Sequence, residues 1–189
     1  MRRVKRGVMV FDLGASGQRL VLESSVVAHL EAHRQLRPQR REAGGQLFAA
    51  FSDGSVIVTE ATGPRPTDRR TRTSYRADRK AEQQEILKRH GRGFHYVGDW
   101  HTHPSPRPSP SDVDYRSIQD SVRQSSHQLH GFVLIVVGTL RGPEGLHVSV
   151  NDGNRSFTLT ASQASGPSVV GDDLNKRRGS EEDRWRARS

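Results

Sequence analysis

The sequence predicts an α/β fold in which a mixed central β-sheet is flanked by helices. Strand-like and helix-like segments follow one another in the order strand, helix, two strands, helix, strand, helix and further strands. The segment 131–139 is too uniformly apolar for an exposed strand, which places it inside the sheet with both faces covered. The sequence contains no internal repeat, and its length suits one domain followed by a tail.

The first part of the chain is predicted to contain a strand, a helix and a hairpin. Residues 18–24 form the strand. Apolar residues then recur at helical spacing over 24–35, with Ser24 or Ser25 as the N-cap. Residues 44–62 form the hairpin, because two apolar segments are joined there by an Asp-Gly turn.

The middle of the chain is predicted to contain a polar loop over 63–74, a charged helix over 75–93 and a strand over 94–103. Alternate side chains of a regular strand point to the same face of a sheet. The strand therefore has two sets of residues: Phe94, Tyr96 and Trp100 on one face, and Val97, His101 and His103 on the other. We expect Trp100 to be a packing residue.

The last ordered elements are predicted to be a helix over 111–125, the apolar strand, and a hairpin of 145–152 and 155–162. Beyond them the hydrophobic periodicity ends and both charges are densely mixed. We therefore expect one domain over 1–163 and a disordered charged tail over 164–189.

The composition excludes several kinds of site. The chain has no cysteine, so disulfides, thiolate metal sites and cysteine nucleophiles are impossible, and a metal must be held by histidine and carboxylate. The longest apolar run is too short to span a bilayer. The N-terminus lacks the apolar stretch and cleavage site of a signal peptide. We expect no membrane partner and a cytoplasmic location.

Arginine runs at 2–6, 37–41 and 68–72 supply much of the net charge of +9. Such runs indicate either contact with an acidic protein, nucleic acid or membrane, or a solvated surface. No aromatic residues interleave them, as a stacking platform for nucleic acid requires. We interpret them as solvated surface and do not expect nucleic acid as a partner.

The stretch GDWHTHPSPRPSPSDVD, 98–114, has the residues of a metal site. His101 and His103 are two apart in a strand, so both imidazoles point to one face. A proline stops the strand, and alternating prolines favour a stiff extended path to a helix. Ser111 and Asp114 have the spacing of a capping box, and a carboxylate in the first helical turn can point back toward the histidines.

Two histidines, one carboxylate and an open fourth position are typical of catalytic zinc, whereas magnesium and calcium prefer oxygen ligands. A second Ser-x-x-Asp at 109–112 makes Asp112 the alternative carboxylate. Hydrolysis of a peptide bond also requires a general base. Glu42 is a candidate, because it precedes a strand and two glycines that permit close backbone approach.

The segment EAGGQL, which begins at Glu42, together with HTHP and SDVD resembles the JAMM metalloprotease family, also called MPN+ or JAB. In the family pattern the Ser-x-x-Asp begins eight residues after the second histidine, which selects Ser111 and Asp114 over the alternative at Asp112. The resemblance covers about residues 18–162 and implies a JAB/MPN-like, cytidine-deaminase-like fold.

The resemblance also implies a role for each residue of the pattern. It implies that His101, His103 and Asp114 bind Zn²⁺, that Glu42 is the general acid and base, and that Ser111 stabilises the oxyanion.

Members of this family cut isopeptide or peptide bonds after the C-terminal tail of ubiquitin or ubiquitin-like proteins. The stretch 98–114 is very similar to the corresponding part of bacterial single-domain deconjugases from CBASS-type anti-phage operons, which occur beside ubiquitin-activating and conjugating-like enzymes. The resemblance thus implies a zinc-dependent isopeptidase that reverses such conjugation. The alternatives are a non-catalytic MPN-type binding module and a JAMM peptidase that processes sulfur-carrier or phage-tail proteins.

Overall fold

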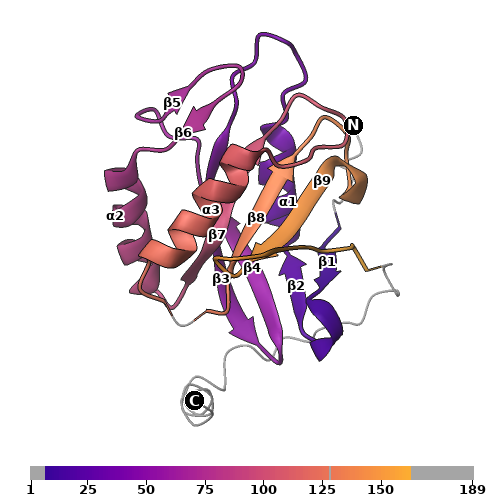
Figure 1. The fold of residues 1–189 in the computed structure, drawn as a ribbon, viewed down its shortest axis with the longest axis vertical. Helices are drawn as coiled ribbons and strands as arrows, with labels where there is room; N and C mark the ends of the chain where they lie inside the picture. The colour runs from indigo at the N-terminus through magenta and orange to yellow at the C-terminus, as the bar shows by residue number, and fades with distance from the viewer. Residues whose placement is uncertain (1–6, 128, 163–189) are drawn as a thin grey trace.

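The computed structural model describes residues 7–127 and 129–162, and in this part of the chain an eight-stranded sheet is covered by helices on both faces (Figure 1). Helix α1 packs on one face, and α2 and α3 lie on the other. The elements are β1 (Met9–Asp12), β2 (Arg19–Leu22), α1 (Ser24–Ala32), β3 (Gly44–Ser52), β4 (Ser55–Ala61), β5 (Arg69–Arg70), β6 (Tyr75–Arg76), α2 (Arg79–His90), β7 (His95–Thr102), α3 (Asp112–Gln124), β8 (Phe132–Val137), β9 (Leu146–Asn151) and β10 (Ser156–Thr158). Short 3₁₀ turns lie at Gly14–Ser16 and Pro143–Gly145.

The sheet is mixed, as predicted, with the strand order β1-β2-β4-β3-β7-β8-β9-β10. The β2–β4 and β7–β8 pairs are parallel and the others are antiparallel. Strand β8 lies between β7 and β9 with all six of its residues buried, which confirms the position expected for the apolar segment. A bridge between Phe11 and Ala161 joins the two ends of the sheet, so the sheet is strongly curled.

Helix α1 forms where its apolar spacing predicts it, and it buries Val26, Val27 and Leu30 against the sheet. The expected serine N-cap is wrong. Glu23 is the N-cap residue, and no side chain caps this end of the helix. The extended strand β2 continues to Leu22, so the helix has already begun at Ser24.

Strand β7 departs from regular alternation at Val97. Leu47 pairs with Gly98 whereas Phe48 pairs with Tyr96, so β7 has one extra residue there. This β-bulge reverses which residues share a face. Val97 and Trp100 pack together on the α1 side, while the Tyr96 ring lies 4.9 Å from that of Phe132 on the α3 side.

The predicted grouping of Tyr96 with Trp100, and of Val97 with the two histidines, is therefore wrong. His101 and His103 do point to one side, as predicted. Trp100 is a packing residue, as expected. It is 1% exposed, and its Nε1 donates to the carbonyl oxygen of Thr62.

The segment between β4 and α2 contains more structure than the predicted polar loop. Strands β5 and β6 form a small separate hairpin, and the predicted helix over 75–93 begins only at Arg79. Asp78 is the N-cap, since its carboxylate accepts from the amides of Lys80 and Ala81. An Asp before a charged helical segment is a start signal that the sequence interpretation missed.

None of the helices in the described part of the chain has the length and apolar character needed to cross a bilayer. The tail predicted over 164–189 lies outside the described residues. The first arginine run, 2–6, lies outside them as well.

Gly98 provides a test of the bulge. Its φ is +145°, and a Cβ atom there would lie 1.9 Å from the carbonyl oxygen of Val133 on β8. We expect Gly98→Ala to lower the free energy of unfolding by more than about 2 kcal/mol, because the β7–β8 pairing must shift. Gly54→Ala is the control, since a Cβ meets no atom within 4 Å there and only its positive φ opposes the change. Equal losses for the two variants in urea denaturation would contradict the role given to Gly98.

Candidate metal centre

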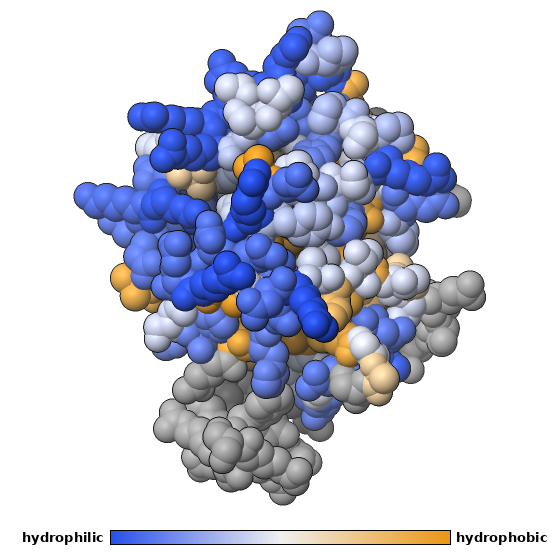
Figure 2. All heavy atoms as spheres, in the orientation of Figure 1, coloured by the Kyte–Doolittle hydropathy of each residue, from blue (hydrophilic) through white to orange (hydrophobic). Residues whose placement is uncertain are grey.

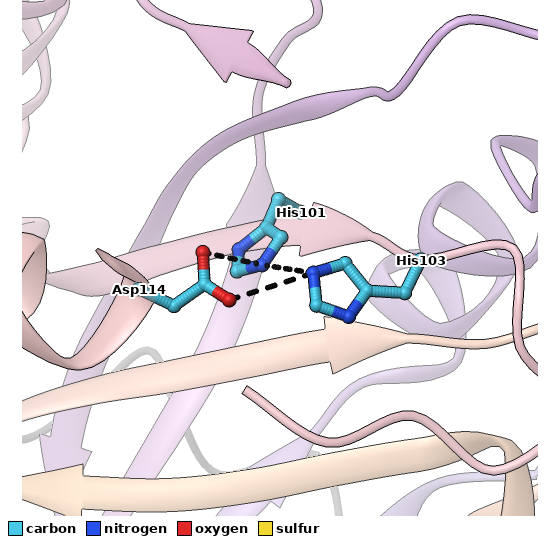
Figure 3. A group of neighbouring side chains, drawn as sticks. All are labelled: His101, His103 and Asp114. Atoms are coloured by element: carbon cyan, nitrogen blue, oxygen red, sulfur yellow. Dashed lines mark hydrogen bonds and ion pairs between the residues drawn. The ribbon is translucent and has the colours of Figure 1, made fainter. Parts of the chain in front are cut away.

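Two histidines at the end of β7 and one aspartate at the start of α3 converge on one point (Figure 3). His101 pairs with Gly44 of β3 and Val136 of β8, so its backbone is held by strands on both sides. His103 lies just beyond the strand, where its amide donates to the carbonyl oxygen of Val137. The parallel β7–β8 pairing thus fixes both imidazoles near the carboxyl ends of these strands.

The distances between the donor atoms fit a small tetrahedral cation. The Nε2 atoms of His101 and His103 are 3.2 Å apart. Asp114 places Oδ1 3.2 Å from Nε2 of His101 and Oδ2 3.4 Å from Nε2 of His103. Ligand bonds of about 2.0–2.1 Å in tetrahedral geometry give ligand–ligand distances of about 3.3 Å. The three side chains are therefore spaced to hold a zinc-sized ion, and this donor set has the nitrogen and oxygen character that zinc accepts.

A capping box holds the aspartate in place. Ser111 is the N-cap of α3, and its hydroxyl accepts from the amide of Asp114. In return, Oδ2 of Asp114 accepts from the amide of Ser111 at 2.6 Å and from its hydroxyl at 2.8 Å. The predicted capping box is thus confirmed. Asp112, one position into the helix, is exposed and does not belong to the group of potential ligands.

The ionised carboxylate of Asp114 favours a bound cation. Burial acts to raise the pKa of Asp114, but its hydrogen bonds with His101 and His103 outweigh burial and hold the pKa well below its usual range. The hydrogen bond to Asp114 raises the pKa of His103. The carboxylate therefore stays ionised, as a metal ligand must.

Glu42, the candidate general base, lies beside these three side chains. It is 7% exposed, and burial raises the pKa of its carboxyl to about 7. The charge of His103 lowers this pKa and that of Asp114 raises it, so Glu42 shares the electrostatic environment of the three converging side chains. A carboxyl with a pKa near neutrality suits proton transfer at physiological pH.

The backbone around Glu42 is closely packed. A Cβ atom on Gly44 would lie 2.5 Å from the ring of Tyr75, and one on Gly45 would lie 1.8 Å from the carbonyl oxygen of Thr62. Only glycine allows these approaches. The two glycines therefore have the role that the sequence predicted for them.

Two further contacts to Glu42 come from a segment that was expected to be a polar loop. The amide of Glu42 donates to the carbonyl oxygen of Thr71, and Nε of Arg70 donates to the carbonyl oxygen of Glu42. Sequence interpretation missed this support, because no local pattern links an arginine run to a glutamate 28 residues away.

Residues 22–157 match the family of prokaryotic homologs of the JAB domain. The chain belongs to this family. The match covers most of the elements that build the sheet and both elements that carry the converging side chains. The family and the fold expected from the resemblance are thus confirmed.

Several relatives are similar over much of this JAB-type domain. A CD-NTase/cGAS isopeptidase of Enterobacter hormaechei is 31% identical over 122 residues, which cover 63% of this chain and 67% of the relative. One from Escherichia coli is 34% identical over 52% of this chain and 65% of its own length. A probable metalloprotease of Sinorhizobium fredii is 34% identical over 54% of this chain and 65% of its own length. The matched region thus spans about two thirds of the length of these relatives.

A solved structure of a protein from Desulfitobacterium hafniense supports the fold. It aligns with a TM-score of 0.52 over 72% of this chain and 87% of that protein, at 16% identity. At this identity the likeness concerns the fold alone.

The assignment of the carboxylate can be tested with two isosteric variants. We expect Asp114→Asn to weaken zinc binding by about 100-fold or more, because a charged donor is lost. Asp112→Asn is the matched control in the same helical turn and should bind zinc like the wild type. Zinc content by elemental analysis and affinity by competition with a chelator measure both effects. If Asp112→Asn loses zinc and Asp114→Asn keeps it, the carboxylate assignment is wrong.

Proposed function

We propose that this JAB-type domain is a zinc-dependent isopeptidase or peptidase that cleaves after the C-terminus of a ubiquitin-like protein or releases such a protein from its conjugate. The observation that carries the proposal is the convergence of His101, His103 and Asp114 beside the buried Glu42. The isopeptidase and metalloprotease names of the relatives support the same reaction class. The anti-phage systems in which such deconjugases occur provide the proposed biological setting.

Each residue has a chemical task in this proposal. His101, His103 and Asp114 would hold Zn²⁺, which would act as a Lewis acid and lower the pKa of a water molecule. Glu42 takes a proton from the attacking water and passes it to the leaving amine. Its raised pKa suits both steps, because the group can accept a proton and return it near pH 7. Arg70 and Thr71 position the backbone of Glu42 for this transfer.

The task proposed for Ser111 requires a change in its hydrogen bonding. A hydroxyl donates only one hydrogen bond. In the structure the Ser111 hydroxyl donates to Asp114. Stabilisation of an oxyanion therefore requires the hydroxyl to turn from Asp114 toward the substrate, while its oxygen continues to cap α3.

The competing proposal is a binding module that uses the same fold without catalysis. Such a module has no need of a complete catalytic set, whereas this chain retains all five residues of the family pattern. JAMM peptidases that process sulfur-carrier or phage-tail proteins share the chemistry and differ in the substrate. Zinc uptake separates the enzyme from the module, and the choice of fusion protein separates the substrates.

Glu42→Gln tests the enzymatic proposal. The substrate is a ubiquitin-like protein encoded near this chain, fused at its C-terminus to a fluorescent reporter. We expect the variant to lose cleavage by about 10²-fold to 10⁴-fold, because the proton acceptor is removed. Its zinc content should remain that of the wild type, because the three proposed ligands are intact.

The outcomes of this experiment are distinct. Full cleavage by Glu42→Gln would remove Glu42 from its assigned role. Absence of both zinc uptake and cleavage in the wild type would favour the binding module. Cleavage of a sulfur-carrier or phage-tail fusion in preference to the ubiquitin-like fusion would change the substrate and keep the chemistry.

Two substitutions of Ser111 separate catalysis from helix capping. Ser111→Ala removes the hydroxyl and the cap, and should cost about 1 kcal/mol of stability, whereas Ser111→Gly costs a few tenths. Both should lower kcat by about 10²-fold to 10³-fold if the hydroxyl donates to the oxyanion. Zinc content is measured alongside, since Ser111 also contacts Asp114. Wild-type kcat in Ser111→Gly would limit Ser111 to capping.

A further inference from the structure

Two arginine runs that are separated in the sequence meet next to the candidate metal centre. The side-chain amide of Gln35 donates to the carbonyl oxygens of Arg40 and Arg72, both at 3.1 Å. The amide of Glu42 donates to Thr71, and Nη2 of Arg70 lies near the carbonyl oxygen of Arg41. These contacts join the segment after α1 to the β5–β6 hairpin.

The joined segments carry a concentration of positive charge, which we call the arginine surface. In the view of Figure 2 hydrophilic side chains cover this end of the molecule, where Figure 1 places β5, β6 and the loop after α1. The arginine surface consists of Arg37, Arg40, Arg41, Arg69, Arg70, Arg72 and Arg76.

The arginines of this surface lack carboxylate partners within the described residues, in contrast to arginines elsewhere. Arg65, Arg89 and Arg141, for example, each form an ion pair with a glutamate. Asp68, the residue before β5, has a buried side chain that accepts from the hydroxyl of Tyr75 and from backbone amides.

Like charges within the surface act on one another. Burial lowers the pKa of Arg70, Tyr75 and the charge of Asp68 raise it, and the charges of Arg41 and Arg40 lower it again. Arg69 and Arg76 are directly paired across the hairpin, a position at which like charges are destabilising. An anionic partner would relieve this repulsion.

An open cavity of about 610 Å³ is lined by residues of both arginine runs and by Pro104. Arg37 and Arg72 line it, together with the apolar side chains Leu36, Pro38 and Pro104. Pro104 is bonded to the proposed ligand His103. An extended chain advances about 3.3–3.6 Å per residue, so a peptide bound at the metal centre reaches this cavity within a few residues.

We propose that the arginine surface, with the cavity between Arg37 and Arg72, binds an acidic stretch of the protein substrate next to the bond that is cut. This inference rests on the proposed function, because it assumes that a peptide chain crosses the metal centre. The apolar side chains that line the cavity can pack against the aliphatic part of a glutamate, and the guanidinium groups of Arg37 and Arg72 can bind its carboxylate.

The chemistry of the surface favours a peptide over nucleic acid. Single-stranded nucleic acid is bound through exposed aromatic side chains on which bases stack. The one aromatic residue in these segments, Tyr75, packs against Gly44 and uses its hydroxyl to contact Asp68.

The test measures binding without requiring hydrolysis. A fluorescent peptide in which glutamate and glycine alternate is titrated with the full chain, and a twin peptide has glutamine in place of glutamate. We expect only the acidic peptide to bind. Its affinity should decrease as NaCl is raised from about 50 mM to about 300 mM, because screening increases. The double variant Arg37→Glu/Arg72→Glu should bind it at least about tenfold more weakly.

A second double variant, Arg19→Glu/Arg155→Glu, makes the same change in net charge at the strand ends that lie away from the metal centre. It should bind the acidic peptide like the wild type. Because glutamate can ligate zinc, the titration is repeated on metal-free protein with EDTA, where binding should persist. Equal binding of the two peptides, equal loss in both double variants, or loss of binding with EDTA would overturn the inference.

Three further outcomes decide the inference, and the last two separate it from the proposed function. A DNA duplex that binds more tightly than the peptide and is lost in Arg37→Glu/Arg72→Glu would assign the surface to nucleic acid and overturn the inference. Cleavage of the reporter fusion with wild-type kcat/KM by that variant would also overturn it, while the proposed reaction stands. Specific peptide binding without cleavage of any fusion would support the surface and reject the reaction.

Discussion

The reciprocal hydrogen bonds between Ser111 and Asp114 connect the start of α3 to the candidate metal centre. They satisfy backbone amides at the helix terminus and at the same time aim the carboxylate at two imidazoles. The imidazoles are held in turn by strand pairing on both sides of β7. One interaction therefore both starts the helix and orients one of the three proposed metal ligands.

The site gathers groups whose charges favour a cation. Glu42 and Asp114 influence one another electrostatically, and burial already raises the pKa of Glu42 to about 7. In the proposed enzyme, a divalent ion at the donor atoms of His101, His103 and Asp114 would compensate the negative charge of the aspartate, and Glu42 would be the group that exchanges protons. The close packing of Gly44 and Gly45 brings Glu42 to this position at the start of β3.

The distribution of arginine distinguishes the body of the domain from the region around its site. Within the body, Arg65 lies among buried polar groups and contacts Gln46, Thr62 and Glu85, which ties the segment before β5 to the sheet and to α2. Around the site, the arginines of the arginine surface are exposed, except for the half-buried Arg70, and form no ion pair with a carboxylate among the described residues. The first arrangement positions the β5–β6 hairpin, and the second leaves unpaired positive charge that we propose binds the substrate.

The sequence by itself determined the order of most elements, the buried strand β8, the convergence of His101 and His103 and the capping box that carries Asp114. These features depend on local spacing, which hydrophobic periodicity and turn chemistry reveal. Only the tertiary structure decided that an extra residue at Val97 reverses the faces of β7, and that two arginine runs meet beside Glu42. Both depend on contacts between residues far apart in the chain, and such contacts leave no periodic pattern in the segments that make them.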